Sequence, residues 1–164
     1  MPRLYFLRRL LTKKNKQILY DSWIKSYILY GIEIYGWVKK TEMTRLQKIQ
    51  NKIVKILFSN KYTFHAKDLY DTLGILQIKQ LQKYTIIIKY FREMKIKRQE
   101  KIKEKPYETK NTTILPIVTR NKFGERKSEF YIPNIFSEFP IQIWKLDKMG
   151  EIKKELRAWL LKGS

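Results

Sequence analysis

Apolar side chains recur at intervals of three and four residues along most of the chain, the spacing that places them on one face of an α-helix. The pattern predicts helices over residues 4–11, 15–30, 41–58, 65–72, 77–104 and 147–162. Asn15 and Thr41 are expected to be N-caps, and Gly74 is expected to end the fourth helix. Gly31 and Gly36 predict an end of the second helix or a sharp bend there.

The helix predicted over residues 41–58 has the most clearly divided faces, at about 100° per residue. One face is apolar and carries Met43, Leu46, Ile49, Ile53 and Leu57. The opposite face, called the basic face below, carries Arg45, Lys48, Lys52 and Lys55. We expect the first face to pack against the protein and the second to meet solvent or an anionic partner.

The second half of the chain is less regular. The stretch from Lys95 to Lys105 is dominated by charge, residues 106–116 have no usable period, and residues 117–146 mix β-branched and aromatic residues with Gly124, Pro133 and Pro140. We therefore expect a helical domain over 1–94, a charged extension and loop over 95–116, and an irregular segment, open to short strands, plus a C-terminal helix over 117–164. The fold class is mainly α, a small helical bundle.

Charge narrows the choice of partner. The 164 residues include 36 Lys and Arg against 15 Asp and Glu, a formal net charge of +21. Such an excess of positive charge favours a polyanionic partner, RNA or DNA before an anionic membrane surface. The alternative is that the many lysines result from unselected drift in a genome rich in A and T. No apolar run reaches the roughly 20 residues of a membrane span, so we expect no membrane partner. The absence of cysteine fits a reducing compartment, and we expect an intracellular protein, nuclear or cytoplasmic.

Residues for catalysis are scarce. The chain has no cysteine and a single histidine, His65, which leaves no thiolate nucleophile and no ordinary zinc ligand set. Asp68 and Asp71 can share a helix face but are typical of a solvated surface, and no glycine-rich phosphate loop occurs. We expect no catalytic residue, no metal site and no cofactor.

Aromatic residues gather in the stretch 27–37, with rings at positions 27, 30, 35 and 37 around two glycines. Exposed rings next to lysines can stack on unpaired bases. We instead interpret these four as packing residues at a glycine-bent junction between two helices, which would orient the basic face.

Six strings along the chain carry a family resemblance: LRRLL at 7–11, YGIEIYG at 30–36, LQKIQNKIVKIL at 46–57, LGILQI at 73–78, TR at 119–120 and PNIFSEFP at 133–140. In this order, and with the terminal amphipathic helix, they resemble the region after the palm in reverse transcriptases of jockey-like non-LTR retrotransposons. The family commonly has Arg where Lys55 stands, and often Trp-Asn in place of Phe136 and Ser137.

The resemblance implies a thumb and C-terminal tail without the fingers, the palm or the catalytic Asp-Asp motif. A thumb of this kind packs beside a palm and grips RNA, DNA or an RNA–DNA hybrid through the backbone. We expect Arg45, Lys48, Lys52 and Lys55 to make that contact. The alternative is a structural or partner-binding helical module, either domesticated or the product of a decayed element without a selected function.

Overall fold

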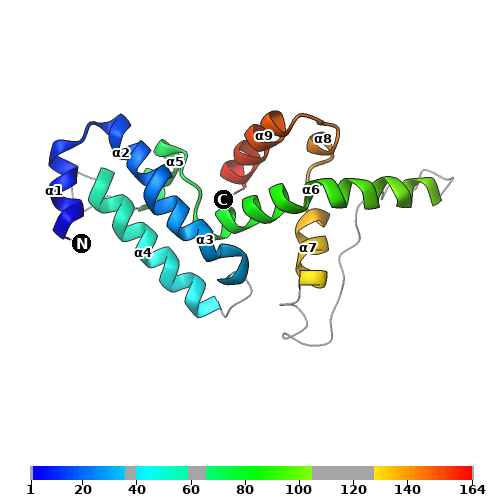
Figure 1. Ribbon diagram of the computed structural model, residues 1–164, viewed down its shortest axis with the longest axis horizontal. Helices are drawn as coiled ribbons and strands as arrows, with labels where there is room; N and C mark the ends of the chain where they lie inside the picture. Colours follow the sequence, from blue (N-terminus) through cyan, green and yellow to red (C-terminus); the bar gives the residue numbers. More distant parts are fainter. Residues whose placement is uncertain (1, 36–39, 59–65, 105–127, 164) are drawn as a thin grey trace. The chain divides into compact units, whose positions relative to one another are not determined.

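The computed structural model describes residues 2–35, 40–58, 66–104 and 128–163. These residues are mainly helical, and none of them forms a strand, which confirms the predicted fold class (Figure 1). The chain divides into two compact units, Met1–Gln82 and Lys83–Lys162. The predicted domain limits at residues 94 and 116 stay a prediction.

The first unit opens with four consecutive helical segments: α1 (Pro2–Leu10), α2 (Lys13–Leu19), the π-helical turn η1 (Tyr20–Ile24) and α3 (Lys25–Tyr35). The predicted cap at Asn15 is wrong, since Thr12 takes that place and its hydroxyl accepts the Asn15 backbone N–H at 3.4 Å. The π-turn is closed by the backbone N–H of Lys25, which donates to the carbonyl of Tyr20.

The predicted break at Gly31 is also wrong, because α3 continues through this residue to Tyr35. Gly31 and Ile32 are both buried, and packing of this turn outweighs the roughly 1 kcal/mol that a glycine costs inside a helix. Gly36 lies outside the described residues.

Two further helices complete the first unit, α4 (Lys40–Phe58) and α5 (Ala66–Leu73). Thr41, expected as a cap, is already inside the first turn of α4. Gly74 ends α5 as predicted, with a φ of 61°, and the Ile75 N–H donates to the Tyr70 carbonyl at 3.0 Å. This is the hydrogen bond of a Schellman ending, which needs a left-handed residue at this position.

α4 packs against α1, α2 and α5, and its inner side helps to build the core of the first unit. That core is a cluster of five buried residues, Tyr20, Val54, Leu57, Tyr70 and Ile75. Figure 1 shows α3 and α4 running alongside each other in opposite directions, and one groove is lined by both. α4 is thereby fixed along its length, which determines where its outer face points.

The second unit contains most of α6 (Ile78–Glu104) together with α7 (Ser128–Ser137), α8 (Ile141–Trp144) and α9 (Met149–Lys162). The helices predicted over 77–104 and 147–162 are confirmed. Residues 128–137 and 141–144, expected to be irregular, are helical, and α7 contains Pro133.

Aromatic packing explains why α7 and α8 form. Phe136 and Trp144 are buried with their ring centroids 5.5 Å apart, and both contact Phe139 between the two helices. Phe91 of α6 stacks on Trp144 at 5.5 Å. The contact of Phe91 joins the rings of α7 and α8 to a helix distant in sequence, so no local period could have indicated it.

Candidate nucleic-acid interface

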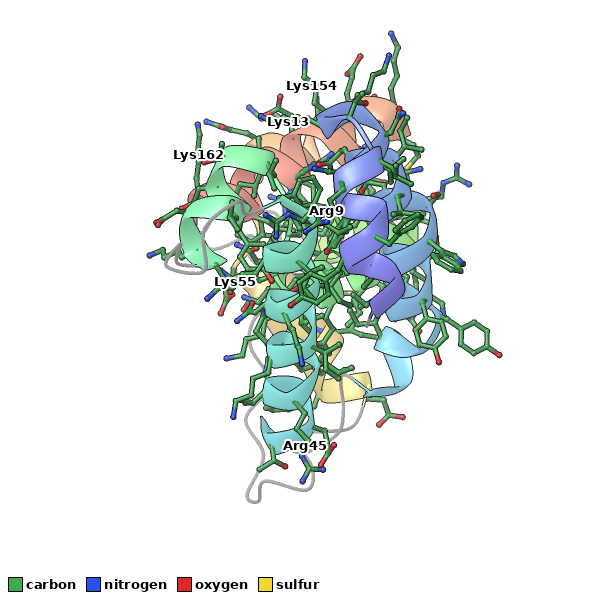
Figure 2. All side chains as sticks on the ribbon, turned by 90° about the vertical axis from the view of Figure 1, so that its left-hand side faces the viewer. Arg9, Lys13, Arg45, Lys55, Lys154 and Lys162 are labelled. Carbon is green, nitrogen blue, oxygen red and sulfur yellow. The ribbon has the colours of Figure 1, made fainter. Side chains whose placement is uncertain are left out.

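The basic face predicted on α4 exists in the structure. Arg45, Lys48 and Lys52 are exposed and Lys55 is half-buried. Figure 2 shows Arg45 and Lys55 toward opposite ends of α4. The ten residues between them correspond to about 15 Å of helix, within an arc of about 80° around the axis. The four cations thus share one side of one rigid element.

The described carboxylates leave most of this charge without an ion pair. Arg45 pairs with Glu42 at 3.0 Å, but both side chains are largely in solvent, where such a pair contributes little and exchanges readily. No carboxylate of the described residues forms an ion pair with Lys48, Lys52 or Lys55. Three of the four cations therefore remain available to an external anion.

The side of α4 that packs against the rest of the first unit is more polar than the spacing of its apolar residues predicts. Met43 and Leu57 are buried as expected, whereas Leu46 and Ile53 are half-buried and Ile49 is 50% exposed. That part of the predicted apolar face is wrong, because the packed side of the helix is rotated toward Gln47 and Gln50. The same rotation leaves the basic face directly opposite the packed side.

Gln50 is 0% exposed and anchors α4 through two hydrogen bonds. Its Nε2 donates to the Tyr20 hydroxyl at 2.8 Å and to the Leu76 carbonyl at 2.9 Å. A buried amide costs free energy when it is left unpaired, and once paired it fixes one arrangement of the elements that it joins. Gln50 therefore ties α4 to η1 and to the segment before α6.

Gln47 extends this polar network by one turn. Its Oε1 accepts the Ile78 backbone N–H at 2.9 Å, which satisfies a free donor at the start of α6. Its Nε2 lies 3.1 Å from the Tyr70 hydroxyl, which itself donates to Asn51 Oδ1 at 2.7 Å. Burial raises the pKa of Tyr70 well above its usual value, even though the hydrogen bond with Gln47 opposes the shift.

Tyr27 and Tyr30, two of the four rings interpreted from the sequence as packing residues, are exposed, and so is Trp23 of η1. Trp23 is 67% exposed, Tyr27 86% and Tyr30 91%. The side chains of Tyr35 and of residue 37 lie outside the described part of the chain, so the interpretation stays a prediction at these two positions. The expected wedge between helices is therefore absent at the positions where it can be checked.

These exposed rings border a groove between the α3 side and α4. The groove has a volume of about 440 Å³ and is lined by Trp23, Ile24, Tyr27, Ile28, Tyr30, Leu46, Ile49, Gln50 and Ile53. Most of these side chains are apolar or aromatic. One sequence feature indicates an aromatic surface here: positions 23, 27 and 30 have the spacing that places them on one side of a helix.

A second cationic site, which the sequence analysis did not single out, lies on α1. Tyr5, Phe6, Arg8 and Arg9 line a hollow of about 460 Å³. Figure 2 places Arg9 on α1, the helix that packs beside α4. Basic side chains of the first unit therefore occur on both of these packed helices.

Residues suited to metal-dependent chemistry do not come together. In the described part of the chain, no group of three or more His, Cys, Asp or Glu side chains could hold a metal ion. Asp68 and Asp71 are both exposed on α5, and His65 lies outside the described residues. None of the helices described here has the length and apolar character needed to cross a membrane.

Comparison of the chain with protein-family models, with curated proteins and with solved structures finds no match.

Proposed function

We propose that this chain binds the backbone of RNA or DNA through Arg45, Lys48, Lys52 and Lys55, with little sequence readout and no catalytic step of its own. The observation that supports it is the exposed basic face of α4, where three of four cations have no ion-pair partner among the described residues. Lysine and arginine bind phosphate as charge, and such phosphate contacts carry no sequence information by themselves. A formal +21 adds long-range attraction to the same partner.

The proposal extends to the origin of the chain, a thumb and tail fragment of a retrotransposon RNA-directed DNA polymerase. The support for it is the ordered set of family-like strings in a mainly helical chain, one of which, residues 46–57, lies on α4. In an intact polymerase a palm domain would then be a further partner. Such a chain would work inside the cell, in the nucleus or the cytoplasm.

The salt dependence expected for binding through the basic face follows from counterion release. Four phosphate contacts on a duplex give a log-log salt slope of about −3.6, so that binding weakens about 150-fold between about 50 and 200 mM salt.

The test is an electrophoretic shift of an RNA–DNA hybrid with Arg45, Lys48, Lys52 and Lys55 all replaced by Glu. Binding should be lost at moderate salt. The matched control replaces four other exposed cations, Lys67, Lys79, Lys153 and Lys154, by Glu and so changes the net charge equally. If both variants lose the same affinity, binding is a diffuse effect of net charge and the assignment to α4 is wrong.

A partner-binding helical module is the second candidate, because Trp23, Tyr27 and Tyr30 expose apolar surface around a groove. Exposed patches of this kind mark interaction sites. This candidate predicts self-association or capture of a partner protein. Light scattering after size exclusion at moderate salt would count against it if the chain elutes as a monomer.

A further inference from the structure

We propose that the groove between α3 and α4 binds the unpaired bases of a single-stranded nucleic acid while the basic face of α4 holds its phosphates. The inference rests on the proposed function and adds a substrate class to it. Trp23, Tyr27 and Tyr30, called the ring row below, would supply the stacking surfaces.

The ring row is built for contact with something outside the first unit. Its members are spaced by four and three residues, which puts them on one side of the helix at separations of about 6 and 4.5 Å along the axis. All three are exposed by two thirds or more. These separations exceed the 3.4 Å rise of a duplex, which favours a strand whose bases are spread apart over one whose bases stay stacked.

The groove beside the ring row has the size and lining of a ligand site. Its volume of about 440 Å³ lies within the range of about 300 to 1,000 Å³ that ligand pockets occupy. Leu46, Ile49 and Ile53 of α4 form the wall that faces the rings. A flat base can lie between an aromatic ring and this aliphatic wall, and every base has a face that can stack.

Ile49 marks the border between this wall and the basic face. Around the axis of α4, Leu46 and Ile53 lie within about 60° of Ile49 on one side, and Arg45 and Lys52 lie within about 60° on the other. A strand whose bases enter the groove would therefore have its phosphates next to the cations. This continuity of an aromatic groove with a cationic rim favours nucleic acid over an apolar protein helix.

Two acidic side chains described on these elements have partners within the protein. Asp21 of η1 accepts a hydrogen bond from Gln17 at 3.0 Å and pairs with Lys25 at 3.5 Å. Glu42 of α4 is paired with Arg45. The charges of Asp21 and Glu42 are thus compensated by side chains three or four residues away.

The experiment measures fluorescence anisotropy of the full chain with three labelled probes: a short oligothymidylate, an abasic strand of the same length, and a blunt duplex. The variant carries Trp23→Ala, Tyr27→Ala and Tyr30→Ala. Its control carries Tyr27→Phe and Tyr30→Phe, which keep the rings. We expect the alanine variant to bind oligothymidylate at least about fivefold more weakly, since one stacked ring contributes about five- to 150-fold. The control should keep the affinity of the unmodified chain.

Binding of the abasic strand and of the duplex should change little in the alanine variant, because phosphate contacts remain. An equal loss on the abasic strand, or no loss on oligothymidylate, overturns the inference while the proposed function stands. Failure of the unmodified chain to bind any probe overturns both. Light scattering of the same proteins adds one more outcome: if the alanine variant only turns a dimer into a monomer, a second copy occupies the groove and the inference is wrong.

Discussion

Tyr20 offers a test of the polar network that orients α4. Its side chain is 1% exposed, and its hydroxyl accepts a hydrogen bond from Gln50 Nε2 at 2.8 Å. Burial raises the pKa of Tyr20 to about 12, the Gln50 hydrogen bond opposes the shift, and the charge of Asp21 adds to it. Replacing Tyr20 by Phe removes this titrating hydroxyl and leaves Gln50 its bond to the Leu76 carbonyl.

The effect of Tyr20→Phe on the free energy of unfolding depends on pH. Near pH 8 the hydroxyl is neutral in both states, and its loss should cost about 0.5 to 1.5 kcal/mol, the net contribution of one hydrogen bond. Because the folded pKa of Tyr20 lies above the unfolded value of about 10, its contribution is complete below pH 10 and is lost as the pH rises toward 12. At about pH 11 this titration has lowered the free energy of unfolding of the unmodified chain by about 1.4 kcal/mol. The Tyr20→Phe variant should then be as stable as the unmodified chain or slightly more stable.

Urea unfolding followed by circular dichroism near pH 8 and near pH 11 measures this difference. Lysine titration acts on both proteins and cancels in the comparison. Burial is the largest cause of the raised pKa of Tyr70, and the charge of Tyr20 adds to it, so Tyr20→Phe also relieves part of that shift and changes the stability at high pH in the same direction. Tyr27→Phe is the control, since that hydroxyl is in solvent in the folded state. A free-energy difference between Tyr20→Phe and the unmodified chain that is the same at both pH values would refute the reasoning.

Three other substitutions test the fold. Gln50→Leu should destabilise the chain by about 2 to 4 kcal/mol, because it leaves two buried acceptors unpaired, and an unchanged urea midpoint would contradict the network. Gly74→Ala should cost about 1 to 2 kcal/mol at a φ of 61°, and a loss of zero would argue against the left-handed ending of α5. Phe136→Ala should cost about 3 to 5 kcal/mol in thermal unfolding, whereas Ile141→Ala, at an exposed site, should change little; equal effects would refute the aromatic core.

Much of the first unit could be predicted from its sequence. The limits of α4 and α5 follow from apolar spacing, and the end of α5 follows from Gly74, since both signals are local. The position of the basic face follows from residue spacing alone. The cap at Thr12 was missed because two polar residues compete near the start of α2, and hydrogen bonding at the helix end selects one of them.

The groove could not be predicted in the same way. Ring spacing shows that Trp23, Tyr27 and Tyr30 share a side, but the same spacing is typical of core residues. Whether another helix covers that side depends on the path of the chain through space. In this structure the rings stay exposed and Ile49 stays half exposed beside them.

The sequence by itself determined the helices with a clear apolar period, the division of α4 into opposite faces and the large positive charge, because these depend on residue type and on a fixed period along the chain. Only the tertiary structure decided that Gln50 is buried while Ile49 is exposed, that α3 passes through Gly31 without a break, and that residues 128–144 are helical. The burial of Gln50 and the packing of residues 128–144 depend on partners distant in sequence, Tyr20 for Gln50 and Phe91 for Trp144. Hydrogen bonding and burial by such partners outweigh local preferences of about 1 kcal/mol per residue.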